Sequence, residues 1–264
     1  MPSDNRPMAT SPAPSSFTHL PSSREEWAQR WELAREVVPE ARNGPRLRYL
    51  IGELSHLAEP ARRPFRKIDV PVSAQARTVM LLPGFATHPI RMRYMARLLE
   101  RAGHKVKRWG LGFNFGPTED NVSYLERRLV EVHERYGREV YLVGWSLGGL
   151  FARELAKRRS DRVAKVITMG SPFSGDPRAN NAWRAYQFVT GHRVDRPPIE
   201  TDIGAKPPVP TVALWSPRDG IVSPRSACGR DCERDRAVAL RCTHMGFTYS
   251  PEAIGAVLRE LDDG

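Results

Sequence analysis

The sequence predicts an α/β protein with a mostly parallel sheet that is covered by helices on both faces. Two observations carry this prediction. From about residue 65 onward, short apolar runs alternate with segments whose apolar residues recur at helical spacing, and such alternation is typical of parallel strands joined by helices. The run at 79–82 is apolar at every position, as expected of a strand that is buried on both faces.

The individual elements of this part of the chain follow from the same patterns. An edge strand is expected at 65–72, where Pro71 stops it. Ser123 and Glu126 form a capping-box pattern in the first turns of a helix that continues to residue 136. Further strands are expected at 78–82, 105–109, 140–143, 163–169, 211–215 and 237–242, and further helices at 91–101, 147–159 and 252–261.

The first 64 residues have a different texture. Residues 1–22 are rich in Pro and Ser and predict a disordered arm, and 23–64 predict a helical extension. Ser22 or Ser23 would cap its first helix. The apolar faces of its two helices carry Trp27, Trp31, Ala34 and Val38, and then Leu47, Leu50, Ile51, Leu54 and Leu57. We expect a helical hairpin that packs on the main domain, with a surface for a membrane or a partner as the alternative.

The main domain, expected at 65–264, contains one segment without a clear strand. About forty residues, at about 173–210, hold several aromatic side chains and two proline pairs. A structureless segment of this length is uncommon unless it has a function. We therefore expect it to form a cap over a site.

Composition and charge limit the partners of the protein. The formal net charge is +11 and is spread along the chain, without a basic block or an aromatic-interleaved nucleic-acid motif. This favours a solvated basic surface, with weak attraction to anionic membrane surfaces or acidic substrates as the alternative, and no nucleic-acid partner. No apolar run approaches 18 residues, and the N-terminal stretch has no signal-peptide core. We expect a cytoplasmic protein of undetermined oligomeric state.

Three cysteines, Cys228, Cys232 and Cys242, lie within fifteen residues of one another. An odd number leaves at least one thiol free unless pairing is intermolecular. A local disulfide, free thiols and, least favoured, a metal site all fit the spacing. We expect neither a metal nor a cofactor.

The five residues Gly144-Trp145-Ser146-Leu147-Gly148 carry the clearest chemical signal. They lie between an expected strand and an expected helix. A serine in a sharp, positive-φ turn between these elements projects its hydroxyl out of the backbone. Glycines on both sides lack a Cβ, so the strand and the helix can approach closely. The pattern predicts a catalytic nucleophile at Ser146.

A serine nucleophile needs a base, and the base needs a group that orients it. Asp219 follows the expected strand 211–215, and His244 follows the expected strand 237–242. The carboxyl ends of parallel strands are where such sites form. We therefore predict Asp219 as the catalytic acid and His244 as the base. The backbone N–H groups of Leu147 and Phe85 are the expected oxyanion donors.

Four segments together resemble the α/β-hydrolase superfamily, and more narrowly bacterial serine esterases and triacylglycerol lipases. They are 81–85, 142–149, 169–175 and 216–222, and His244 completes the set. The resemblance covers about residues 77–261. It implies the α/β-hydrolase fold, a Ser-Asp-His triad, an acyl-enzyme intermediate and hydrolysis of small-molecule or lipid carboxylic esters.

The sequence also departs from these lipases. Pro83-Gly84 replaces their usual His-Gly pair, Trp145 stands where many have His, and their calcium loop is absent after His244. The aromatic residues Trp145, Trp183 and Phe188 are candidate substrate-binding residues. An acyltransferase on the same triad and a non-catalytic binding protein with this fold are the alternatives to an esterase.

Overall fold

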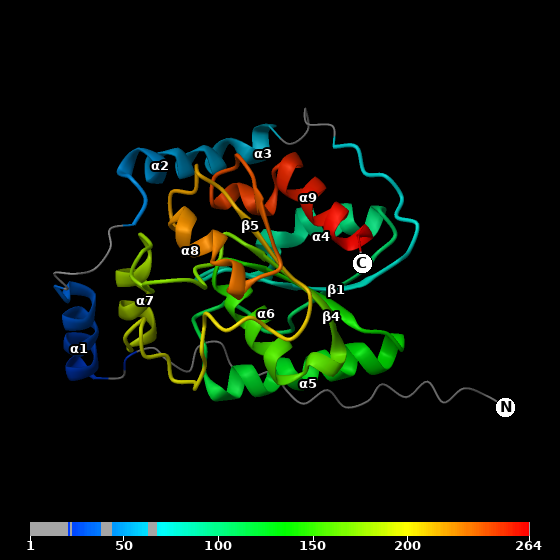
Figure 1. The fold of residues 1–264 in the computed structure, drawn as a ribbon. Coiled ribbons are helices and arrows are strands. Elements are labelled where there is room, and N and C mark those ends of the chain that lie inside the picture. The colour runs from blue at the N-terminus through cyan, green and yellow to red at the C-terminus, as the bar shows by residue number, and fades with distance from the viewer. Residues whose placement is uncertain (1–20, 22, 38–43, 63–67, 264) are drawn as a thin grey trace.

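The structure is a computed structural model that describes residues 21, 23–37, 44–62 and 68–263. Its centre is a six-stranded sheet with the order β2-β1-β3-β4-β5-β6 in which each neighbouring pair is parallel (Figure 1). The strands are β1 (Thr78–Leu82), β2 (Lys105–Arg108), β3 (Val140–Trp145), β4 (Val163–Met169), β5 (Thr211–Trp215) and β6 (Arg236–Ala239). The predicted α/β class with a parallel sheet is confirmed.

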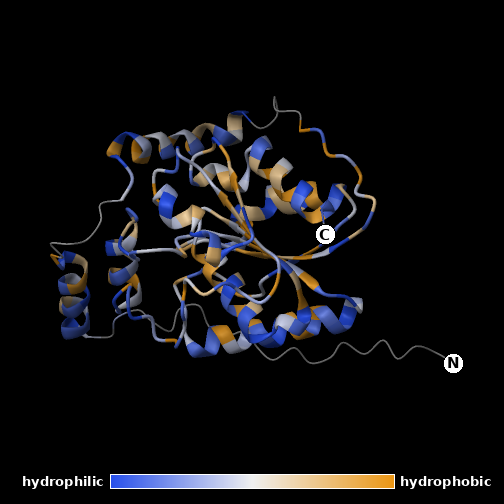
Figure 2. Cartoon of the chain, viewed as in Figure 1, coloured by the Kyte–Doolittle hydropathy of each residue, from blue (hydrophilic) through white to orange (hydrophobic). Residues whose placement is uncertain are grey.

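Helices cover both faces of this sheet. Helices α4 (Arg93–Arg101) and α9 (Pro251–Asp262) lie on one face, and α5 (Glu119–Tyr136) and α6 (Leu147–Arg158) lie on the other (Figure 1). Alternate residues of β1 point to opposite faces, so Leu81 joins the core under α4 and α9 whereas Leu82 joins the core under α5 and α6. Figure 2 shows the hydrophobic residues gathered along the central strands.

Most element boundaries agree with the sequence patterns to within two residues. Strand β6 ends at Ala239 instead of 242, and α5 begins before the capping-box pattern, since the hydroxyl of Thr118 accepts a hydrogen bond from the backbone N–H of Asn121. Residues 65–67 of the expected edge strand lie outside the described residues, and 68–72 form no strand. Ile68 and Val70 pack against the core without joining the sheet.

The expected cap segment contains one helix, α7 (Trp183–Thr190). Helix α1 (Arg24–Arg35), which Ser23 caps as predicted, packs against it. Trp27 and Trp31 contact the ring of Phe188, with ring centroids 5.8 and 4.9 Å away. The first N-terminal helix therefore extends the cap segment (Figure 1). Val38, the last apolar residue of its predicted face, lies outside the described residues.

The second helical stretch packs elsewhere, so the expected hairpin does not form. It consists of α2 (Leu47–Gly52), the 3-10 helix η1 (Glu53–Ala58) and α3 (Glu59–Arg62). This stretch lies apart from α1, above α8 (Pro224–Cys228) in Figure 1. Its predicted apolar face is largely turned outward: Leu47, Ile51, Leu54 and Leu57 are 60–69% exposed, whereas Glu53 and Glu59 are buried. The segment turns this way because the buried carboxylate of Glu53 accepts hydrogen bonds from the backbone of Gly220 and His244.

The three cysteines are free thiols, so the local disulfide that the spacing allowed is absent. Burial raises the pKa of the Cys242 thiol to about 12.

Among the described residues, no helix combines the length and the apolar character that crossing a bilayer requires.

Candidate active site

Ser146 occupies a strained turn between β3 and α6. Its backbone angles are φ 55° and ψ −123°, and a positive φ is rare for a residue with a Cβ. The neighbouring backbone is packed tightly: a Cβ added at Gly148 would lie 2.1 Å from the carbonyl oxygen of Leu82, and one at Gly144 would lie 2.3 Å from that of Gly148. Strand and helix can therefore meet around the serine only because both flanking residues are glycines.

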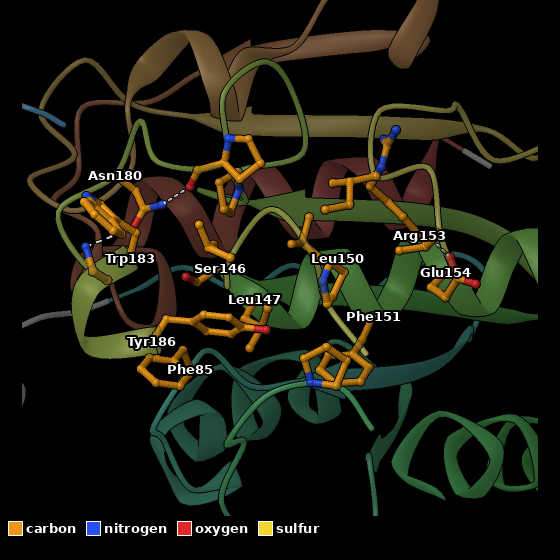
Figure 3. A pocket seen from close by; sticks show the side chains of 18 of the residues that line it. Phe85, Ser146, Leu147, Leu150, Phe151, Arg153, Glu154, Asn180, Trp183 and Tyr186 are labelled. Carbon is orange, nitrogen blue, oxygen red and sulfur yellow. Dashed lines mark hydrogen bonds between the residues drawn. The ribbon is translucent and has the colours of Figure 1, made fainter. Parts of the chain in front are cut away.

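A mostly apolar pocket opens at this serine. Ser146 lies between the aromatic side chains of Phe85, Trp183 and Tyr186 and the residues Leu150 and Phe151 of α6 (Figure 3). The cap segment closes the pocket with Val194, Pro197, Ile199 and Ile203. Such a lining suits the apolar part of a small molecule.

Asp219 and His244 form a buried pair. His244 Nδ1 lies 2.8 Å from Oδ2 of Asp219, and the two residues are only 3% and 1% exposed. The second carboxylate oxygen of Asp219 accepts hydrogen bonds from the backbone N–H groups of Ile221 and Val222, each 2.8 Å long. Both carboxylate oxygens of Asp219 are thus hydrogen-bonded, which holds the carboxylate in one orientation.

Two opposing effects act on the imidazole of His244. Burial lowers its pKa, but the charge and hydrogen bond of Asp219 and the charge of Glu53 raise it, and the pKa ends above its ordinary value of 6.5. A carboxylate at Nδ1 keeps the ring proton on that nitrogen in the neutral form. The Nε2 atom is then the basic one, as a general base beside a serine requires.

The loop that carries His244 is connected to the residue before the nucleophile. The indole Nε1–H of Trp145 donates to the carbonyl oxygen of His244 over 3.1 Å, and the two rings lie 5.6 Å apart. Gly170, which follows β4 and has a φ of 57°, packs against the Asp219–His244 pair: a Cβ there would lie 2.9 Å from Asp219 Oδ2 and 3.1 Å from His244 Nδ1. The backbone N–H of Ser146 donates to the carbonyl oxygen of Met169, the residue before Gly170, so the serine lies at the same carboxyl edge of the sheet as the Asp219–His244 pair.

The predicted oxyanion residues flank the nucleophile. Phe85 and Leu147 both line the pocket with Ser146. The turn that carries Phe85 is held by Asn114, a fully buried residue whose side-chain amide donates to the carbonyl of Pro83 over 2.7 Å. The carbonyl of Asn114 accepts from the N–H of Ala86, which itself has a φ of 53°. This loop is thus fixed in an unusual conformation beside the serine.

The predicted substrate-binding residues separate into two groups. Trp183 lines the pocket. Trp145 does not, because its ring is buried in the core and directed at His244, and Phe188 does not, because it is covered by Trp27 and Trp31 of α1. Tyr186 lines the pocket beside Phe85, with ring centroids 5.3 Å apart.

Two residues of the site were missed by the sequence analysis. Glu53 contacts the loops of Asp219 and His244, and Asn114 holds the loop of Phe85. The only signals were weak ones: a glutamate within an otherwise apolar helical stretch, and a polar residue between Phe113 and Phe115.

Comparison with known proteins bears on the family and the fold. Residues 77–220 match the family model described as alpha/beta hydrolase fold, a range that includes Ser146 and Asp219 and ends before His244. Among curated proteins, the chain is similar to the pimeloyl-(acyl-carrier protein) methyl ester esterase of Vibrio cholerae serotype O1, with 31% identity over 118 residues, and to that of Nitrosospira multiformis, with 29% over 114 residues.

These similarities are partial. The alignments cover 44% and 40% of this chain and 44% and 42% of the two esterases, so the chain spans less than half the length of these relatives. Among solved structures, Aspergillus fumigatus lipase B superimposes with a TM-score of 0.53 at 19% identity, covering 71% of this chain and 54% of the lipase. At this identity the likeness is one of fold alone.

Proposed function

This chain belongs to the alpha/beta hydrolase family, and from that premise we propose that it is a serine hydrolase that cleaves carboxylic esters. Ser146 is the proposed nucleophile, His244 the base and Asp219 the group that orients the base. The observation that carries the proposal is the buried His244–Asp219 pair at the same edge of the sheet as a serine held at positive φ.

The proposed reaction proceeds in two halves. Ser146 Oγ attacks the ester carbonyl while Nε2 of His244 accepts the hydroxyl proton, and the N–H groups of Phe85 and Leu147 stabilise the negative charge that develops on the carbonyl oxygen. The ester bond then breaks, and His244 returns the proton to the leaving alcohol. A water molecule, deprotonated by His244, attacks the acyl-enzyme and releases the carboxylic acid and free Ser146.

The pocket supports a substrate whose acyl part is apolar. Its lining is mostly aromatic and aliphatic, from α6, α7 and the rest of the cap segment, and Arg153, Glu154 and Lys157 of α6 contribute charged side chains. The curated relatives are named as esterases of a methyl ester, which supports ester chemistry for this chain as well.

A panel of p-nitrophenyl esters of increasing acyl length tests this proposal. We expect hydrolysis by the wild-type protein and a loss of at least about 10³-fold in Ser146→Ala, because removal of a triad nucleophile leaves only the contribution of binding and the oxyanion donors. The matched control is Ser160→Ala, an exposed serine two residues beyond the end of α6, which should retain full activity.

The same assay separates the alternatives. Full activity in Ser146→Ala would contradict the proposal. Formation of a new ester when an alcohol acceptor is added, at the expense of free acid, would identify the protein as an acyltransferase instead. No turnover and no reaction with a fluorophosphonate by the folded protein would favour a binding protein.

A further inference from the structure

We propose that Glu53, contributed by the N-terminal helical segment, is a positioning residue that clamps the loops of Asp219 and His244 together through its carboxylate. The proposal rests on the proposed function in that it assigns the pair a catalytic role. Its experimental test includes measurements that do not require activity.

One carboxylate accepts backbone hydrogen bonds from both loops. Oε1 of Glu53 accepts from the N–H of Gly220 over 2.9 Å and from the N–H of His244 over 2.7 Å, and Oε2 accepts from the N–H of Met245 over 2.9 Å. Glu53 itself is only 5% exposed. The contact therefore links the residue after the acid, the base itself and the residue after the base.

These bonds account for the burial of a charged side chain. Removing a carboxylate from water is costly unless hydrogen bonds replace the lost hydration. Three charge-assisted bonds from backbone amides supply that replacement. They also explain the inverted orientation of this helical segment, because turning Glu53 toward the loops necessarily turns Leu54 and Ile51 toward the solvent.

The segment fits closely against the acid loop. A Cβ added at Gly220 would lie 2.4 Å from the carbonyl oxygen of Tyr49 and 2.7 Å from the backbone nitrogen of Leu50. Gly220 has no positive φ, so the helix is what restricts this position to glycine. The backbone of α2 thus touches the residue that follows Asp219, which leaves little freedom for the carboxylate of Glu53.

A hydrogen bond from the hydroxyl of Ser216 to the carbonyl oxygen of Cys242, 2.6 Å long, joins the two loops closer to their strands, and the clamp adds contacts next to the pair itself. Asp219 follows β5 and His244 follows β6, and their productive contact is a single hydrogen bond of 2.8 Å. A displacement of about 1 Å in such a constellation costs up to about 100-fold in rate. A group that binds both loops at once fixes the distance between them. The charge of Glu53 also acts on the imidazole, in the same direction as that of Asp219.

Two variants remove the clamp by different routes. Glu53→Gln places an N–H₂ group where one oxygen accepts hydrogen bonds, and Gly220→Ala pushes α2 away without altering Glu53. The matched control, Glu59→Gln, removes a buried carboxylate from the same segment. Fluorophosphonate labelling of Ser146 should slow by about 10- to 100-fold in the two variants and stay at the wild-type rate in the control.

Two readouts identify positioning as the cause. By hydrogen exchange, the amides of Gly220, His244 and Met245 should lose protection in Glu53→Gln and keep it in Glu59→Gln. By NMR titration, the pKa of His244 should fall in Glu53→Gln, because a negative charge near the imidazolium has been removed. A role limited to general stability would lower the melting temperature and leave both the exchange pattern and the titration of the folded protein unchanged.

Several outcomes would overturn the proposal. The first is wild-type exchange at these three amides and wild-type His244 titration in folded Glu53→Gln. The second is loss of folding in both Glu53→Gln and Gly220→Ala, since the segment would then support the whole domain. Absence of labelling in the wild-type protein would instead overturn the proposed function, while exchange and titration still decide whether Glu53 holds the pair.

Discussion

The two halves of the candidate site are built in different ways. The nucleophile half is made by the backbone of β3 and α6, where glycines allow contacts that no other residue permits. The acid–base half is made by two loops that both donate backbone hydrogen bonds to a carboxylate from a separate segment of the chain. The first half is encoded within five consecutive residues. The second depends on hydrogen bonds between residues 167 and 191 positions apart.

This difference suggests where each half is vulnerable. A backbone turn that is packed from all sides tolerates almost no added side-chain volume at its glycines. Loops that a side chain holds depend in addition on its charge and hydrogen bonds. The four variants and conditions below test the contrast, beginning with the largest expected effect.

Removing the charge of Asp219 should have the largest effect on the acid–base half. Asp219→Asn keeps the shape of the side chain but favours the wrong tautomer of His244, and the analogous change in a serine protease lowers kcat by about 10⁴-fold. We expect a loss of similar size in p-nitrophenyl ester hydrolysis. Asp231→Asn, at a carboxylate that is 97% exposed, is the control. Equal activity of the two variants would contradict the role of Asp219.

Adding one methyl group to the nucleophile half should affect stability and activity together. In Gly148→Ala the new Cβ would lie 2.1 Å from the oxygen of Leu82, so the turn must open. We expect the free energy of unfolding to fall by about 1–3 kcal/mol, as measured by urea denaturation. In Gly255→Ala, on α9, the nearest contact is 3.5 Å from the end of a flexible arginine, and the helix should gain up to about 1 kcal/mol. A stable, active Gly148→Ala would refute the close packing.

The pH profile should report on His244. Its raised pKa means that the ring stays protonated, and therefore inactive as a base, up to a pH above 6.5. Activity as kcat/KM should therefore be lost as the pH falls through a value above 6.5, and the rate of fluorophosphonate labelling should follow the same curve. An inflection below 6.5 would mean that the charges of Asp219 and Glu53 do not outweigh burial.

The outward face of the N-terminal segment should matter least. Leu54 is adjacent to Glu53 but is 60% exposed. Leu54→Ser should therefore change the free energy of unfolding by less than about 0.5 kcal/mol, whereas Glu53→Gln alters the site. A loss of more than about 1 kcal/mol in Leu54→Ser would mean that this face is covered, and that the segment does not lie as described.

The sequence predicted the sheet and the nucleophile turn because both leave local signatures. Apolar runs mark β1, β4 and β5 to within a residue, and the glycines around Ser146 mark the turn. Asp219 and His244 could be inferred from their places after strands. The clamp could not be predicted, because the helical spacing of the leucines at 47–57 indicates a buried apolar face. A tertiary contact to Glu53 reverses that orientation, and it leaves no periodic trace in the sequence.

The same limit applies to the pocket. Aromatic residues in the segment 173–210 indicated a cap, but which of them line the pocket depends on α1. Because α1 covers Phe188, that ring is withdrawn from the pocket, whereas Trp183 and Tyr186 remain. Spacing within the cap segment alone contains no information about this partner.

The most direct test of the account is to identify the residue that reacts with a fluorophosphonate. Intact-mass analysis followed by peptide mapping should find one adduct per chain, on Ser146, and the adduct should be absent in Ser146→Ala and form at least about 10³-fold more slowly in His244→Ala. An adduct on another residue, or unchanged labelling of Ser146 in His244→Ala, would contradict the proposed triad.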